Sequence, residues 1–111
     1  MDFKGKVAVV TGAAAGIGRA TAIAFAEHGA SVALLDRNTA GVEETVSIIC
    51  GKNARAFALG CDVGVEKEVV DAFGQIATHF AQIDILVNNA GVELYKTFGN
   101  SNLVNGSACW Q

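Results

Sequence analysis

The chain has 111 residues, of which 51% are apolar, 17% are charged and none is proline, and its formal net charge is −3. This composition indicates one globular domain with buried strands, and it excludes the basic surface that nucleic acids or anionic membranes require. The apolar runs are short and interrupted, so we predict neither a signal peptide nor a membrane span and expect a cytoplasmic protein.

Strand-like and helix-like segments alternate along the chain. In order, we predict strand 6–10, helix 17–28, strand 31–35, a helix that starts after Asn38, strand 55–59, a helix that contains residues 69–80, and strand 84–87. The side chain of Asn38 is a typical helix cap, and Gly29 is a typical residue to end a helix. This alternation predicts an α/β fold with a parallel sheet, right-handed crossovers and helices on both faces.

Each predicted helix carries an apolar stripe that we expect to face the core. The first stripe consists of Ile17, Ala20, Ala24 and Phe25. The second consists of Val42, Val46 and Ile49. The third consists of Val69, Phe73, Ile76, Ala77 and Phe80, and acidic residues at its amino end suit the helix dipole.

The segment TGAAAGIG, residues 11–18, follows the first predicted strand and opens the first helix. Gly12 permits a sharp turn, Gly16 lets a ligand approach the main chain, and Gly18 lets the helix pack closely. The free amides and positive dipole end of such a helix suit a pyrophosphate. An ordinary strand-to-helix turn is the alternative, whereas a P-loop is excluded because no Lys-Ser or Lys-Thr follows the last glycine.

Polar residues follow the other three predicted strands. Asp36 lies eighteen residues after Gly18 and can accept hydrogen bonds from both ribose hydroxyls of an adenosine. Asp62 can accept a hydrogen bond from an adenine amino group beside Val63, and the segment NNAG, residues 88–91, ends the fourth strand. Each feature alone is equally typical of turns, but all of them fall at strand carboxyl ends, where ligands of α/β sheets bind.

Together these motifs resemble the cofactor-binding half of the short-chain dehydrogenase/reductase family, over residues 3–98. The resemblance implies a Rossmann-like sheet with strand order 3-2-1-4 and a dinucleotide, NAD rather than NADP because Asp36 would repel a 2′-phosphate. It implies a set of cofactor-binding residues: Gly12, Gly16, Ile17, Gly18, Asp36, Asp62, Val63, Asn89, Ala90 and Gly91. Asn88 would mainly brace the sheet.

The resemblance stops near residue 98. Family members continue with a serine and a Tyr-x-x-x-Lys helix, whereas Tyr95 is the only tyrosine here and Gly99 stands four residues after it. We therefore predict a truncated form without catalytic residues, with a partial NAD(P)-binding domain in residues 1–98. Residues 99–111 are rich in Gly, Asn and Ser, and we predict a disordered tail foreign to the family.

Two classes of function remain open. One is a truncated NAD-dependent oxidoreductase, whose parent moves hydride between a nicotinamide and an alcohol or carbonyl carbon. The other is a non-catalytic nucleotide-binding or regulatory half-domain that acts on a full-length relative. We expect homo-oligomers in the family but no oligomer-forming helices here. Three widely spaced cysteines predict reduced thiols rather than zinc or disulfides, and we expect no metal site.

Overall fold

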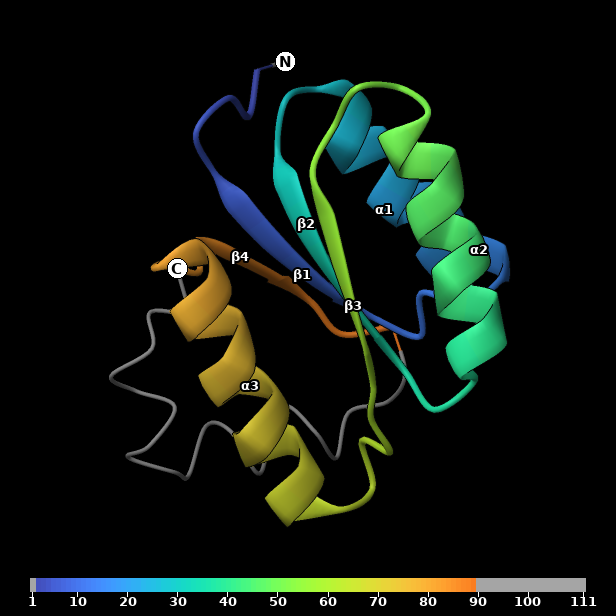
Figure 1. Ribbon diagram of the computed structural model, residues 1–111, viewed down its shortest axis with the longest axis vertical. Coiled ribbons are helices and arrows are strands. Elements are labelled where there is room, and N and C mark those ends of the chain that lie inside the picture. The colour runs from blue at the N-terminus through green and yellow to red at the C-terminus, as the bar shows by residue number, and fades with distance from the viewer. Residues whose placement is uncertain (1, 90–111) are drawn as a thin grey trace.

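The computed structural model describes residues 2–89. Strands and helices alternate without exception: β1 (Val7–Thr11), α1 (Gly16–Glu27), β2 (Ser31–Asp36), α2 (Thr39–Cys50), β3 (Ala56–Gly60), α3 (Glu66–Phe80) and β4 (Ile85–Val87). The strands form one parallel sheet in the order β3-β2-β1-β4 (Figure 1). The predicted α/β class and the Rossmann-like strand order are thereby confirmed. The predicted bounds of the four strands and of the first helix agree with the observed bounds to within one residue.

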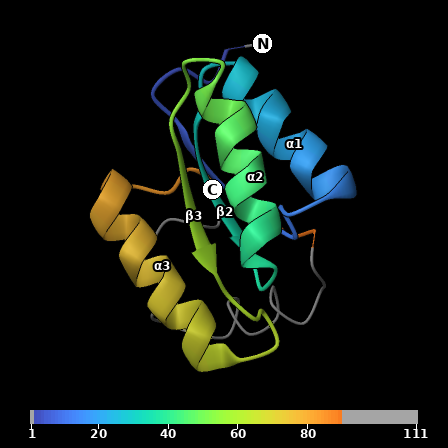
Figure 2. The same ribbon diagram turned by 45° about the vertical axis from the view of Figure 1, so that its right-hand side comes forward.

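Three layers build the molecule, with α1 and α2 on one face of the sheet and α3 on the other (Figures 1 and 2). Successive residues of a strand point to opposite faces, and β1 shows the consequence. Ala8 and Val10 pack in the cluster that α1 and α2 cover, whereas Val9 packs in the cluster that α3 covers. Because both faces are covered, every residue of β1 is buried, which explains its continuous apolar run.

The predicted apolar face of α1 is largely wrong, because only Phe25 of its four residues packs against the core, half-buried. Its buried residues are Gly18, Ala22 and Ala26, whereas Ile17 is 76% exposed. The reason is steric, because the row at i, i+4 and i+8 that lies closest to the core has room only for Gly and Ala, while Ile23 and Phe25 pack beside it. A search for large apolar side chains therefore selects the neighbouring face.

The other two stripes are largely confirmed. In α2, Val42 and Ile49 are buried and Val46 is half-buried against the same cluster, while Thr45, which we did not assign to the stripe, is buried as well. In α3 the members at 69, 73 and 76 are buried, with those at 77 and 80 half-buried. The predicted Asn38 cap is also confirmed, since its side-chain oxygen accepts from the amide of Gly41 at 3.0 Å. Within residues 2–89 no helix combines the length and hydropathy needed to cross a bilayer.

Candidate functional site

The carboxyl ends of all four strands meet at one edge of the parallel sheet, and the predicted site residues follow these ends. The structure places eight of the ten, and they lie in or beside the loops after β1, β2, β3 and β4: Gly12, Gly16, Ile17, Gly18, Asp36, Asp62, Val63 and Asn89. Ala90 and Gly91 fall outside the described residues, as do Tyr95 and residues 99–111.

The loop between β1 and α1 depends on its glycines in three ways. Gly12 and Gly16 adopt positive φ angles of 65° and 59°, a conformation that strains other residues. At Gly16 an added Cβ would meet no heavy atom within 4 Å, so the space beside it is open to a ligand. At Gly18 an added Cβ would overlap the carbonyl oxygen of Gly12, so α1 crosses its own loop in direct contact.

The amino end of α1 has the features of an anion site. The first amides of any helix lack acceptors within the helix, and the dipole places positive potential there. Ala15 occupies the capping position of α1, and among the described residues no side chain accepts a hydrogen bond from this end of the helix. The first turn of α1 also contains no acidic residue. By contrast, Asn38 caps α2, and two glutamates lie in the first turn of α3. Ile17, on the first turn of α1, exposes an apolar side chain beside these amides.

Asp36, the last residue of β2, faces this loop. Its Oδ2 accepts from the amide of Ala14 at 3.1 Å and its Oδ1 accepts from the amide of Asn38 at 2.9 Å. These two bonds hold the half-buried carboxylate in one orientation. Because an ionised carboxylate offers about four acceptor positions, it retains capacity for two further donors, such as a pair of hydroxyls.

A hollow of about 280 Å³ opens beside Asp36. It is lined by Gly12, Asp36, Arg37, Cys61, Asp62 and Val63. The Asp62 carboxylate is held by the Gly64 amide at 2.9 Å and by an ion pair with Arg37 at 3.6 Å. The hollow thus brings together predicted residues from three separate loops, with an apolar wall at Val63 and carboxylates beside it.

The end of β4 is tied to the end of β1 through Thr11, which sequence reasoning missed. The Thr11 hydroxyl lies 3.2 Å from Asn88 Oδ1 and accepts from the Asn89 amide at 2.9 Å. Asn89 Nδ2 also donates to the Gly12 carbonyl oxygen at 3.4 Å. Asn88 and Asn89 therefore hold neighbouring strand ends and the loop together.

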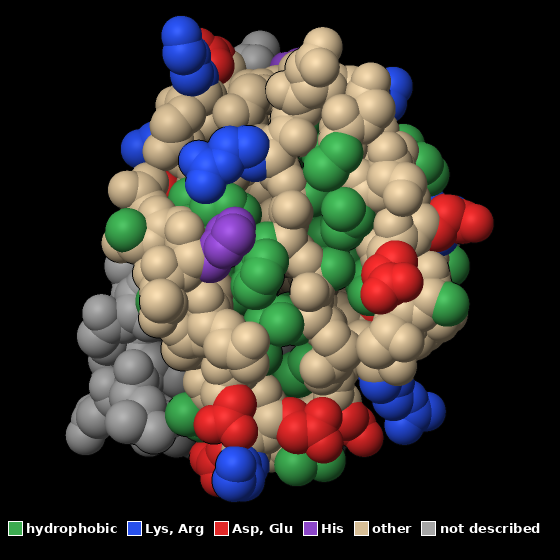
Figure 3. Space-filling model, in the orientation of Figure 1, with side chains coloured by type: hydrophobic (Ala, Val, Ile, Leu, Met, Phe, Trp, Pro, Cys, Tyr) green, Lys and Arg blue, Asp and Glu red, His purple; other side chains and the backbone are tan. Residues whose placement is uncertain are grey.

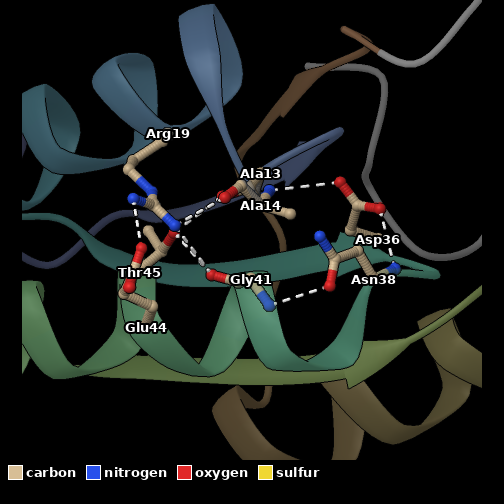
Figure 4. Close-up of polar contacts among 8 residues, drawn as sticks. All are labelled: Ala13, Ala14, Arg19, Asp36, Asn38, Gly41, Glu44 and Thr45. Atoms are coloured by element: carbon tan, nitrogen blue, oxygen red, sulfur yellow. Dashed lines mark hydrogen bonds and ion pairs between the residues drawn. The ribbon is translucent and has the colours of Figure 1, made fainter.

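Sequence reasoning also missed Arg19 and Thr45. Both lie on the α2 side of the glycine-rich loop and bind its main chain (Figure 4). The available signal was a polar residue at an apolar stripe position, because Thr45 follows Val42 by three residues and precedes Ile49 by four. No comparable signal marked Arg19, since arginine is an ordinary residue on a helix.

The Cys61 thiol forms part of the hollow and is 2% exposed. Burial raises its pKa from the usual 9.0 to about 11, and the negative charges of Glu68 and Asp62 add to this effect. Because the thiolate is the reactive form, Cys61 is an inert thiol near neutral pH.

We predict slow alkylation of Cys61 in the double variant Cys50→Ser, Cys109→Ser, where it is the sole thiol. At pH 8 iodoacetamide should react with the folded protein about a hundredfold more slowly than with urea-unfolded protein, as the thiolate fraction implies. Because the folded protein holds the thiol proton more tightly than the unfolded chain does, the free energy of unfolding should fall as the pH rises from 9 to 11. Equal alkylation rates in the two states would show that the thiol is not shielded.

A second, larger hollow carries no comparable set of groups. It measures about 640 Å³ and lies between β3 and α3, lined by residues such as Phe57, Val70 and His79. Figure 3 shows apolar side chains along the gap between α3 and α2, over β3. Its β3 residue, Phe57, lies near the amino end of that strand, and none of its lining residues belongs to the glycine-rich loop. Within residues 2–89 there is no cluster of three or more potential metal ligands.

Comparisons with known proteins bear on the family and the fold of the chain. The sequence profile of the family described as short chain dehydrogenase matches residues 6–110. The matched residues extend past residue 98, where we predicted the end of the family-like domain. The described structure ends at residue 89, so the boundary stays a prediction.

Individual relatives cover most of the chain. Mouse 15-hydroxyprostaglandin dehydrogenase [NAD(+)] is 43% identical over 107 residues, which are 95% of this chain and 40% of the relative. D-threitol dehydrogenase of Mycolicibacterium smegmatis is 45% identical, covering 82% of this chain and 36% of the relative. The chain therefore spans about 40% of the length of these curated relatives.

Solved structures show the same arrangement of elements. A hydroxysteroid dehydrogenase from Escherichia coli superposes with a TM-score of 0.79 at 41% identity, over 81% of this chain and 38% of that one. A short-chain type dehydrogenase/reductase from Mycobacterium marinum gives 0.80 at 30% identity, over 96% and 50%.

Proposed function

Because the chain belongs to the short-chain dehydrogenase family, we propose that residues 1–98 are the NAD-binding part of an oxidoreductase. The proposed parent reaction is hydride transfer between a nicotinamide cofactor and an alcohol or carbonyl carbon. One observation carries the proposal: the uncapped amino end of α1 and the Asp36 carboxylate meet at a single loop, where the Ala14 amide joins them.

The residues present fit a dinucleotide. Positive φ at Gly16 and the open space beside it would allow a pyrophosphate to reach the first amides of α1. The fixed Asp36 carboxylate would accept from the adenosine ribose, and the hollow lined by Asp62 and Val63 would take the adenine. Asn89, with Ala90 and Gly91, would lie toward the nicotinamide ribose.

The bound cofactor would supply the hydride carrier, and the chain would supply its orientation. Thr11, Asn88 and Asn89 join the ends of β1 and β4 and so hold the glycine-rich loop where it meets β4. Gly18 holds the loop against α1 through its contact with Gly12. Contacts on both sides restrict the loop before the cofactor binds, which would lower the ordering cost of binding.

NAD is the proposed cofactor because of the charge on Asp36. A 2′-phosphate at this position would meet a carboxylate that is already held in place by two amides. Arg37 is adjacent, but its guanidinium pairs with Asp62 and 79% of its side chain is exposed, which weakens any compensation. The name of the mouse relative specifies NAD(+), which supports the same choice.

We predict that Asp36→Ala lowers the affinity for NAD by about tenfold or more, since hydrogen bonds to a charged group are lost. The affinity for NADP should fall less or rise, so the ratio of the two dissociation constants should move toward one. Titration of the full 111-residue chain with each cofactor by calorimetry provides both constants. Equal affinity of the unsubstituted chain for NAD and NADP would refute the assignment of Asp36.

The location in the cytoplasm and the lack of oligomer-forming helices stay predictions. The alternative function, a non-catalytic nucleotide-binding half-domain, uses the same site, and both functions predict no hydride transfer by this chain alone. The coding DNA beyond codon 98 separates the two, because a reading frame that resumes the family pattern and reaches Tyr-x-x-x-Lys would support the truncated oxidoreductase.

A further inference from the structure

A polar cluster joins α1 and α2 on the α2 side of the glycine-rich loop (Figure 4). The Arg19 guanidinium lies at its centre, and 24% of this side chain is exposed. Its Nε donates to Thr45 Oγ1 at 2.9 Å, and its Nη2 donates to the carbonyl oxygens of Ala14 at 2.6 Å and Gly41 at 3.1 Å. Its Nη1 pairs with the Glu44 carboxylate at 2.6 Å.

Thr45 extends the cluster along the loop. Its side chain is fully buried, and its hydroxyl donates to the Ala13 carbonyl oxygen at 2.8 Å while accepting from Arg19. Successive loop carbonyls, those of Ala13 and Ala14, are therefore each bound by a side chain. The Ala14 amide is bound as well, by Asp36 on the opposite side. Both polar groups of Ala14 are thus fixed.

These bonds determine where the neighbouring amides point. A peptide group is planar, so fixing the carbonyl of Ala14 also fixes the amide of Ala15 on the opposite side of the same peptide. The amides that follow, at Gly16 and Ile17, begin α1 and take their direction from the helix. The bond from Arg19 to Ala14 is charge-assisted and short, which makes it one of the stronger hydrogen bonds.

We propose that Arg19 and Thr45 are positioning residues for the cofactor's pyrophosphate. They hold the loop carbonyls on the α2 side, and the amides from Ala15 onward therefore face the ligand before it binds. The inference rests on the proposed function, because it assigns these residues a task at the dinucleotide site. Neither residue touches the ligand in this scheme, and their effect passes through the main chain of Ala13 and Ala14.

A purely structural role, in which Arg19 only attaches α1 to α2, is the competing explanation. The ion pair with Glu44 and the bonds to Thr45 Oγ1 and the Gly41 carbonyl oxygen would serve it, although the Glu44 carboxylate is 65% exposed and such ion pairs contribute little. The more buried contacts instead reach the main chain of the loop through Thr45 and Arg19. The two explanations predict different changes in ligand affinity. Loss of positioning would lower the affinity for ligands that carry the pyrophosphate, whereas loss of packing would lower the affinity for every ligand.

The test compares ADP with adenosine, which share adenine and ribose and differ in the pyrophosphate. Both are titrated into the full 111-residue chain and followed by ¹⁵N–¹H spectra. Arg19→Lys keeps the charge and Thr45→Val keeps the shape, and we expect each to lower the affinity for ADP by about tenfold. The affinity for adenosine should fall by less than about threefold. Arg55→Lys is the matched control, because Arg55 lies over the Phe80 ring, far from the loop.

Thr45→Ser keeps the hydroxyl that Thr45→Val removes, so it should bind ADP about as well as the unsubstituted chain. This comparison remains available even if Arg19→Lys fails to fold. Equal weakening of ADP and adenosine, or none, in variants that melt cooperatively would overturn the positioning role and leave packing alone. Failure of the unsubstituted chain to bind ADP would overturn the proposed function itself, and this inference with it.

Discussion

Gly18→Ala should abolish tight NAD binding, with at least a hundredfold loss of affinity. The added Cβ would overlap the carbonyl oxygen of Gly12 and come within 2.8 Å of Asn89 Nδ2. Because Gly12 presents main chain, it cannot rotate away, so α1 must shift from the loop that it crosses. Such overpacking typically costs about 1–3 kcal/mol of stability. Thermal melting followed by circular dichroism and NAD titration would measure both effects.

Gly74→Ala is the matched control for this substitution. Gly74 lies within α3, and an added Cβ there would meet no heavy atom within 4 Å. Alanine should therefore raise the stability by roughly 0.5–1 kcal/mol, because it lowers the conformational freedom of the unfolded chain. NAD affinity should not change. An unaltered melt and unaltered affinity in Gly18→Ala would disprove the close contact between α1 and its loop.

The polypeptide of residues 1–111 should not catalyse hydride transfer by itself. When hydride reaches a carbonyl carbon, the oxygen must receive a proton, and losing this proton transfer costs about 10²–10⁴-fold in rate. The family resemblance assigns it to a tyrosine assisted by a lysine four residues later. Tyr95 is the only tyrosine and Gly99 stands at that spacing. Lys96 is adjacent in sequence and so does not stand at the spacing that the family resemblance gives the lysine.

The assay uses purified protein with NADH or NAD and a panel of ketones, ketoesters and alcohols, followed at the nicotinamide absorbance band. NAD binding is measured on the same preparation, so that an unfolded sample is not mistaken for an inactive one. Gly16→Val identifies contaminating activity, because valine would disfavour the positive φ of 59° at that position. Turnover that survives repurification and disappears in Gly16→Val would contradict the prediction and exclude the non-catalytic alternative.

Local sequence patterns were sufficient to predict the architecture. Short apolar runs identify strands that are buried on both faces, and helical stripes between them imply parallel crossovers. Asn38 was recognisable as a cap because capping involves only residues three apart. The glycine spacing and the polar residues after each strand likewise predicted that one sheet edge would gather the candidate site. These features depend on neighbours in sequence, so sequence alone determines them.

Tertiary structure decided the features that depend on distant residues. The buried face of α1 follows from its close approach to the sheet, which selects Gly18 and Ala22 over the larger Ile17. Arg19 reaches Thr45 across 26 residues of sequence, and Thr11 reaches Asn89 across 78. Periodicity measures only whether a side chain is apolar and where it recurs. It carries no information about which main-chain carbonyl or hydroxyl lies opposite, because packing of the whole domain creates that neighbourhood.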